Sequence, residues 1–288
     1  MPRWFRTRRS RPISAPLGVI AGGGPFPAQV AAAAVAQGRP VFLAGLRGYV
    51  DEAALAPFPH RILRMGAAGD IMAVLRQAGC TDLVIVGPVH RPSLLDLRPD
   101  AVGIRILARI GRAAFGGDDG FLSAIVHVLG EEGFSVIGAH EILNEALAPA
   151  GVLGTLQPDA AARQDIARGV AVVRALGAAD VGQGAVVQQG IVLAVEAIEG
   201  TDAMLARAAG LARPGPGGVL VKLVKPGQDR RTDLPAIGPA TIAAAAAAGL
   251  RGLAFEAGGT LMTDRAACIA GADAAGLFLL GLIDGDFP

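Results

Sequence analysis

Three carboxylates lie within seven residues in the second half of the chain. Glu196, Glu199 and Asp202 stand where an apolar run gives way to a helical pattern. Carboxylates this close repel one another unless a cation lies among them, and their oxygens are ligands that Mg²⁺ and Mn²⁺ prefer. Thr201 or Asp202 could simply cap the helix, but Glu196 on the apolar run is harder to explain in that way. The pattern favours a divalent cation held by Glu196, Glu199 and Asp202.

A basic segment that ends in a carboxylate follows. Lys222, Lys225, Arg230 and Arg231 precede Asp233 in a stretch rich in proline and glycine. Lysine and arginine can neutralise the oxygens of a pyrophosphate, while a carboxylate holds a metal ion or orients water. A solvated loop would have the same composition, so the residues alone leave both interpretations open.

A glycine turn near the start of the chain is a second candidate for phosphate binding. Gly22, Gly23 and Gly24 follow an apolar run and precede an alanine-rich helical segment, where free backbone N–H groups could bind phosphate or sugar. A purely structural turn fits equally well. Pro27 occupies the position of the third glycine of the dinucleotide fingerprint, which argues against an NAD-linked oxidoreductase.

Other polar residues have simpler alternatives. Asp118 and Asp119 precede a helical pattern and could cap it or hold a cation. His140 and Glu141 follow a predicted strand, where open α/β sheets bind ligands, but they could equally be loop residues. His90 also follows a strand, and a loop role is the favoured interpretation.

The order of apolar runs predicts two α/β domains. In the first half strands alternate with helices, which is typical of a Rossmann-like parallel sheet covered by helices. In the second half two apolar runs flank Gln189 and Gly190 as in an antiparallel hairpin, so a mixed α/β domain is expected. We expect strands at 17–21, 40–43, 82–86, 135–137, 184–188, 191–197, 219–224, 253–255 and 277–282, and helices at 70–78, 102–110, 120–132, 160–176 and 240–248.

Domain boundaries follow from the same pattern. Residues 1–16 form a basic tail, 17–145 the first domain and 159–288 the second, joined by a linker at 146–158 that is rich in proline and glycine. Five arginines stand among the first eleven residues of the tail, beside Trp4 and Phe5. The tail could be a disordered extension or could contact an anionic membrane surface.

Composition indicates a cytoplasmic protein. Hydrophobic residues make up 52% and the mean hydropathy is +0.48, but no apolar run approaches the roughly 18 residues of a spanning helix, and much of the apolar content is alanine. Without the tail, Lys and Arg are fewer than the 25 Asp and Glu residues, which excludes a general affinity for nucleic acid. Two cysteines, Cys80 and Cys268, suggest neither a ligand cluster nor a disulfide framework.

Several motifs in order along the chain resemble one family, the bacterial UDP-2,3-diacylglucosamine pyrophosphatases that are unrelated to the calcineurin-like enzymes. The resemblance extends from Leu17 to the C-terminus. One departure is Pro88 with His90, where the family has Asn and Ser, and this makes a catalytic His90 less expected; the arginine tail also lies outside the pattern. The motifs are at 17–24, 117–119, 138–141, 182–187, 196–202, 233–238 and 256–258.

The resemblance implies a two-domain enzyme that binds its lipid-bearing sugar nucleotide between the domains and needs Mg²⁺ or Mn²⁺. It implies that Asp233 is critical for turnover and that water attacks the phosphorus nearer the sugar, giving UMP and 2,3-diacylglucosamine 1-phosphate for lipid A synthesis. A homodimer and peripheral contact with the inner membrane are compatible with it, and a non-catalytic sugar-nucleotide-binding or regulatory protein is the alternative. We expect Asp233, Glu196, Glu199 and Asp202 to bind metal, and Gly22, Gly23, Gly24, Gln183, Thr201, Lys222, Lys225 and Arg231 to bind substrate.

Overall fold

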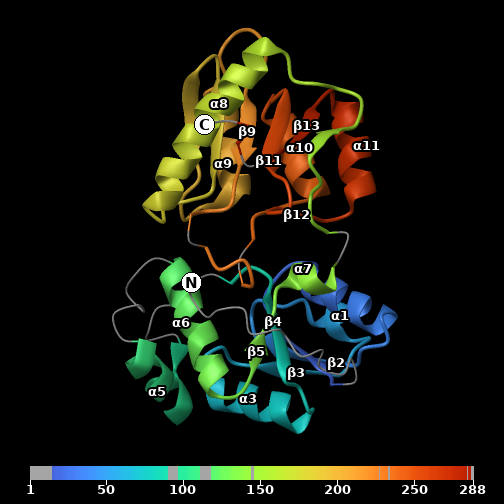
Figure 1. The fold of residues 1–288 in the computed structure, drawn as a ribbon, viewed down its shortest axis with the longest axis vertical. Coiled ribbons are helices and arrows are strands. Elements are labelled where there is room, and N and C mark those ends of the chain that lie inside the picture. Colours follow the sequence, from blue (N-terminus) through green and yellow to red (C-terminus); the bar gives the residue numbers. More distant parts are fainter. Residues whose placement is uncertain are drawn as a thin grey trace, which may run out of the picture. The chain divides into compact units, whose positions relative to one another are not determined.

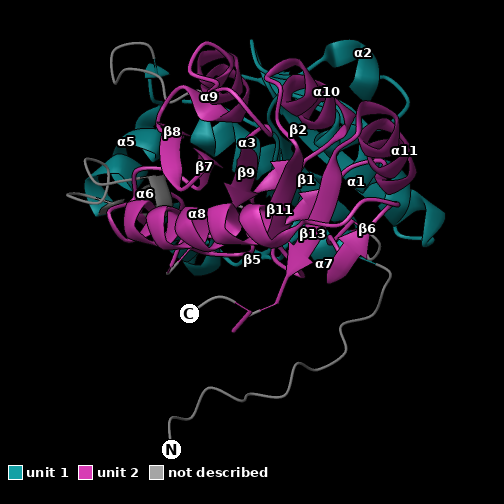
Figure 2. Cartoon of the chain, turned by 90° about the horizontal axis from the view of Figure 1, so that it is seen from above, with its two compact units in different colours: residues 1–114, 123–142 teal, residues 115–122, 143–288 magenta. Residues whose placement is uncertain are grey.

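The computed structural model describes residues 15–89, 97–110, 118–143, 146–226, 228–232, 234–283 and 285–286. Asp233, His90 and the arginine-rich part of the tail lie outside these residues, as do the side chains of Asp118 and Asp119. The chain divides into two compact units (Figure 2). Unit 1 comprises residues 1–114 and 123–142, and unit 2 comprises residues 115–122 and 143–288.

Unit 1 contains a five-stranded parallel sheet in the order β3-β2-β1-β4-β5 (Figure 1). Its strands are β1 (Leu17–Ala21), β2 (Val41–Leu46), β3 (His60–Leu63), β4 (Asp82–Val86) and β5 (Ser135–Val136). The order is that of the first five strands of Rossmann-type sheets. All strands run parallel, but the sequence order of the strands across the sheet reverses between β1 and β4. This confirms the predicted parallel α/β sheet.

The helices of unit 1 pack on this sheet through their apolar residues. Helix α3 buries Ile71, Met72 and Leu75, which join Leu83 and Val136 of the sheet in one core cluster. The central strand β1 is an almost entirely buried apolar run, as expected for a strand covered on both faces. The helices are α1 (Phe26–Ala36), α2 (Glu52–Leu55), α3 (Ala68–Gln77), α5 (Ala101–Ile110), α6 (Asp118–Glu131), of which residues 123–131 belong to this unit, and α7 (Ala139–Ile142).

Unit 2 contains a six-stranded mixed sheet in the order β6-β13-β11-β9-β7-β8. Its centre is parallel, whereas β6, β7 and β8 pair in antiparallel fashion, which confirms the mixed second domain. A smaller sheet pairs β10 (Ala236–Ile237) with β12 (Leu261–Met262). The six strands are β6 (Gly151–Leu153), β7 (Gly184–Gln188), β8 (Ile191–Val195), β9 (Val219–Lys222), β11 (Gly252–Glu256) and β13 (Phe278–Leu282).

Helices cover both faces of this sheet (Figure 2). Helix α8 (Ala160–Ala178) packs on one face, where Val221 lies against Gly169. The other face carries α9 (Gly200–Ala209), α10 (Pro239–Ala247) and α11 (Arg265–Ala275). The alternation of side chains along each strand therefore assigns every residue of the sheet to the α8 face or to the α9 face.

Four strands, β3, β6, β10 and β12, were not expected from the sequence, and β10 and β12 have only two residues each. β3 has two exposed residues among its four, so it has little apolar signal. β6 lies inside the segment 146–158 that we predicted to be a linker, and it pairs with β13 at the edge of the sheet. No helix of the described residues is long and apolar enough to cross a membrane.

Candidate functional site

Polar residues gather at one edge of the unit 2 sheet, where β9 and β11 end. Lys222, the last residue of β9, is paired in register with Gly184, the first residue of β7. Because β7 and β8 form a hairpin, the end of β8 lies at the same edge, and the backbone N–H of Glu196 donates to the carbonyl of Gly184 at 2.8 Å. We call this the carboxyl edge of unit 2. It is where open α/β sheets place their ligands.

Lys222, Thr201 and Glu196 form a buried chain of polar contacts on the α9 face. The Lys222 ammonium donates to the Thr201 hydroxyl, which donates in turn to Oε1 of Glu196 at 2.7 Å. Lys222 Nζ lies 3.8 Å from the same oxygen. Lys222 and Glu196 are only 5% and 6% exposed, so the contacts provide the compensation that a buried charge requires. The structure thus joins a predicted metal ligand to two predicted substrate-binding residues.

The second oxygen of Glu196, Oε2, is buried and has no hydrogen-bond partner among the described residues. Glycines make room for this residue: a Cβ at Gly184 would lie 2.6 Å from Oε2 of its side chain, and a Cβ at Gly182 would lie 2.0 Å from its backbone carbonyl oxygen. A buried carboxylate oxygen without a donor is costly, so this atom suits a cation or a hydrogen-bond donor supplied by a ligand.

The other two carboxylates of the predicted metal set point elsewhere. Glu199 is the N-cap of α9 and forms a 2.6 Å ion pair with Arg207. Its pKa is lowered, first by a hydrogen bond from its own backbone N–H and then by Arg207. Asp202 is exposed in the first turn of α9. The described residues contain no group of three His, Cys, Asp or Glu that could hold a metal ion, and with Asp233 outside them the four-residue set stays a prediction.

The predicted phosphate-binding cations also have carboxylate partners. Lys225, which is 9% exposed, donates to Asp180 at 2.6 Å on the α8 side of the sheet. Arg230 forms a 2.7 Å ion pair with Glu256 at the end of β11. Their charges are therefore balanced within the fold before any ligand binds.

Arg231 forms a bidentate ion pair with Asp229. Nε donates to Oδ1 at 2.9 Å and Nη2 donates to Oδ2 at 2.6 Å, and Arg231 lowers the pKa of Asp229. Asp180 and Asp229 were not identified from the sequence, and Glu256 was noted only as part of the motif at 256–258, with no role as an ion-pair partner. The partners Asp180 and Glu256 are far from their cations along the chain, and no local pattern signals such pairing.

Gln183 lies at the same edge but on the other face. Its carbonyl accepts from the backbone N–H of Leu223 at 3.0 Å, and its side-chain Oε1 is buried without a hydrogen-bond partner among the described residues. Alternation along β7 places Gln183 on the α8 face, opposite Lys222. Its predicted role in substrate binding therefore remains a prediction, and its position differs from that of Thr201 and Lys222.

The glycine turn of unit 1 contacts the end of β4 and the loop that follows it. The N–H of Gly22 donates to Val86 at 2.8 Å and that of Gly23 donates to Pro88 at 2.9 Å. A Cβ at Gly22 would lie 2.4 Å from the Gly87 carbonyl oxygen, and Gly24 has a left-handed φ of 73°. These contacts favour the structural-turn interpretation for Gly22 and Gly23, while phosphate binding by the turn stays a prediction.

Among the other candidates, Glu141 accepts from the backbone N–H of Gly138 at 3.0 Å, beside the start of α7. The Nδ1 atom of His140 is buried without a partner among the described residues, and its ring packs where a Cβ on Gly138 would otherwise lie. No cation-binding group forms around either residue in the described part of the chain.

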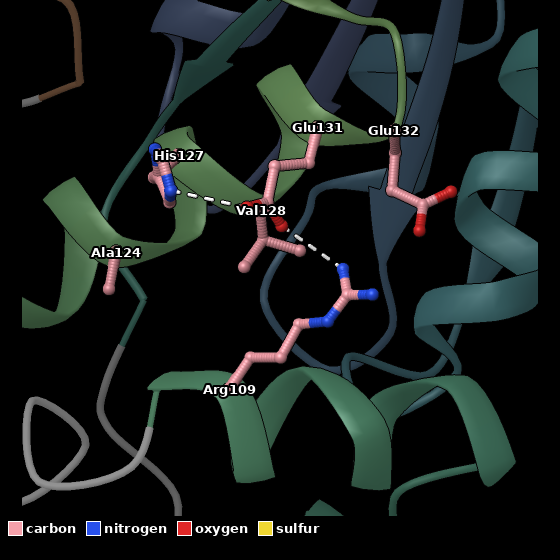
Figure 3. Close-up of a pocket in the computed structure, with 6 residues that line it drawn as sticks. All are labelled: Arg109, Ala124, His127, Val128, Glu131 and Glu132. Carbon is pink, nitrogen blue, oxygen red and sulfur yellow. Dashed lines mark hydrogen bonds and ion pairs between the residues drawn. The ribbon is translucent and has the colours of Figure 1, made fainter.

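A polar groove of about 640 Å³ lies between α5 and α6 of unit 1 (Figure 3). In it Glu131 contacts His127 Nε2 at 3.3 Å and Arg109 Nη1 at 3.1 Å. All three side chains are largely exposed, so these ion pairs contribute little to stability and form no preorganised site. The groove is lined by Arg109, Ala124, His127, Val128, Glu131 and Glu132.

The protein consists of two α/β units, and the six-stranded sheet of unit 2 carries lysines and carboxylates at its carboxyl edge. Models of the LpxI N-terminal and C-terminal domains match residues 16–146 and 149–280. The chain is 44% identical over 272 residues to the UDP-2,3-diacylglucosamine pyrophosphatase LpxI of Caulobacter vibrioides. The aligned residues cover 92% of this chain and 97% of that protein. The chain belongs to the LpxI family, which confirms the resemblance inferred from its motifs.

Proposed function

We propose that this protein hydrolyses UDP-2,3-diacylglucosamine to UMP and 2,3-diacylglucosamine 1-phosphate, a step towards lipid A. The observation that carries the proposal is the 44% identity, over 97% of its length, to a relative named for this pyrophosphatase activity. The carboxyl edge of unit 2 supports it, because that edge brings together buried cationic and anionic side chains of the kind that phosphoryl chemistry uses.

In this proposal Lys222 holds the pyrophosphate. An ammonium group has three N–H donors, and the contact with Thr201 uses one of them. Thr201 and Glu196 fix the direction of the side chain before substrate arrives, so little reorganisation is needed when charge develops on the phosphoryl oxygens. Lys225 and Arg231 would bind the substrate at the rim of the site, and Gln183 would bind it from the other face of the sheet.

We further propose a requirement for Mg²⁺ or Mn²⁺, with Asp233 and the unpartnered Oε2 of Glu196 as the leading ligands. Bound there, the cation would neutralise phosphoryl charge and lower the pKa of a water molecule. Glu199 and Asp202 belong to the proposed set as well, but Glu199 would first have to leave Arg207.

Asp233 is proposed as the group that orients the attacking water, either directly or as a metal ligand, with attack on the phosphorus nearer the sugar. A carboxylate cannot itself stabilise the negative charge that builds on a phosphoryl oxygen, so it must act through metal or water. We place the reaction in the cytoplasm with peripheral contact at the inner membrane, where a lipid-linked substrate would be met. A homodimer stays a prediction.

The test is to incubate the purified protein with UDP-2,3-diacylglucosamine and Mg²⁺ and to follow UMP by chromatography. We expect UMP from the wild type, and a kcat lower by about 10² to 10⁴-fold for Asp233→Asn at similar substrate affinity, because the lost interaction acts mainly in the transition state. Substrate binding without any UMP would instead favour a sugar-nucleotide-binding or regulatory protein.

A further inference from the structure

Ile198 is fully exposed at the carboxyl edge of unit 2. Its relative exposure is 102%, the highest of the exposed large apolar side chains in the described part of the chain. It stands two residues after Glu196 and three before Thr201, in the connection between β8 and α9. Single exposed apolar residues are common, so its exposure alone decides nothing. The position of the residue and the structure of its turn are what make it informative.

The turn that carries Ile198 is held in place on both sides. The backbone N–H of Gly200 donates to Ala197 at 3.2 Å, and Gly200 has a left-handed φ of 78°. Arg207 of α9 donates to the Val195 carbonyl at 2.9 Å and to Glu199 at 2.6 Å. On the inner side Glu196 is tied to Thr201. The fold therefore presents the isoleucine outward from an anchored loop.

We infer that Ile198 contacts an acyl chain of the substrate and contributes to selectivity for long chains. This inference rests on the proposed function. In a 2,3-diacylglucosamine the first acyl group is attached to the carbon next to the one that bears the phosphate. If Lys222 holds the pyrophosphate, that chain must leave the site within a few bonds of it, and Ile198 is the exposed apolar side chain of the loop that connects Glu196 to Thr201.

The surroundings favour an acyl chain over a bilayer surface as the occupant. Glu199 is paired with Arg207, but Asp202, four residues after Ile198, is exposed, and its carboxylate is repelled by the anionic surface of a bacterial inner membrane. A neutral hydrocarbon chain meets no such repulsion and gains from contact with the isoleucine.

The test compares Ile198→Asn with Ile191→Asn on two substrates in detergent. Ile191 is 45% exposed at the start of β8, the opposite end of the strand, and so is a matched control. The substrates are UDP-2,3-diacylglucosamine with long chains and its analogue with acetyl groups. We expect Ile198→Asn to lower kcat/KM for the long-chain substrate by about tenfold and that for the acetyl analogue by less than about twofold. Ile191→Asn should change neither, and both variants should melt like the wild type.

Three results would overturn the inference. The first is a kcat/KM of Ile198→Asn that equals the wild-type value on both substrates, and the second is an equal loss on both substrates. The third is a loss seen only on vesicles of phosphatidylethanolamine and phosphatidylglycerol, accompanied by weaker sedimentation with them, which would assign Ile198 to the membrane. Failure of the wild type to hydrolyse either substrate would instead remove the proposed function, so the two failures are distinguishable.

Discussion

The buried pair of Lys222 and Glu196 makes a quantitative prediction about stability. Replacing Glu196 by Gln leaves an acceptor for the Thr201 hydroxyl but removes the negative charge near Lys222, which is 5% exposed. Removing one partner of a buried pair costs about 3–5 kcal/mol because the other charge is left without compensation. The 3.8 Å separation and the bridging hydroxyl place this pair at the lower end, at about 3 kcal/mol.

The loss should appear in the thermal unfolding of unit 2. For a domain of about 150 residues, 1 kcal/mol shifts the melting temperature by about 2–4 °C, so Glu196→Gln should melt about 6–12 °C lower. Lys222→Met alone should also destabilise, since it leaves the carboxylate unpaired. The double variant removes both charges and should recover to within about 1 kcal/mol of the wild type.

Differential scanning calorimetry of the wild type, both single variants and the double variant completes the cycle. Glu199→Gln is the control, because its ion pair with Arg207 is half exposed and should change the melting temperature little. The reasoning is refuted if Glu196→Gln melts with the wild type, or if the double variant loses the sum of the two single losses. Recovery of stability without recovery of UMP release would separate the structural role of the pair from its proposed role in the reaction.

Three further predictions concern other parts of the molecule. EDTA should abolish UMP release and Mg²⁺ or Mn²⁺ should restore it, so full activity in chelator would exclude the proposed metal. Gly22→Ala should destabilise unit 1 by about 1–3 kcal/mol in urea unfolding, because its Cβ would lie 2.4 Å from a carbonyl oxygen. The control Gly130→Ala, in α6 with open space around it, should stabilise by up to about 1 kcal/mol. Equal effects of the two substitutions would contradict this prediction. Burial raises the pKa of the Cys80 and Cys268 thiols to about 11, so iodoacetamide at pH 8 should label both only on unfolding, and labelling at the rate of a free thiol would refute it.

Much of the fold could be predicted from the sequence because its strands are apolar and its turns are marked. The run Leu17–Ala21 and the strand Asp82–Val86 are each followed by a glycine, and their predicted ends agree with the structure. The hairpin of unit 2 was predicted from Gln189 and Gly190, which have φ values of 55° and 75° as a tight turn requires. β3 and β6 were missed because pairing at the sheet edges, of β3 with β2 and of β6 with the distant β13, makes them strands, whereas their composition does not signal it.

The candidate site was only partly predictable for a similar reason. Residue types identified Glu196, Thr201 and Lys222, and the fold brings these three into contact. The partners that balance the other cations could not be found, since Lys225 and Asp180 are 45 residues apart in the chain. Glu199 was predicted to bind metal with the neighbouring carboxylates, but its side chain pairs with Arg207 of α9. Closeness in sequence did not reveal this direction of the side chain.

The central claim is that this chain cleaves the pyrophosphate of a lipid-bearing UDP-sugar, and hydrolysis in H₂¹⁸O with mass spectrometry of the products tests it most directly. We predict unlabelled UMP and 2,3-diacylglucosamine 1-phosphate that carries one ¹⁸O, because water is proposed to attack the phosphorus nearer the sugar. Label in UMP would contradict the direction of attack. Release of UDP, or recovery of intact substrate with Mg²⁺ present, would contradict the claim itself.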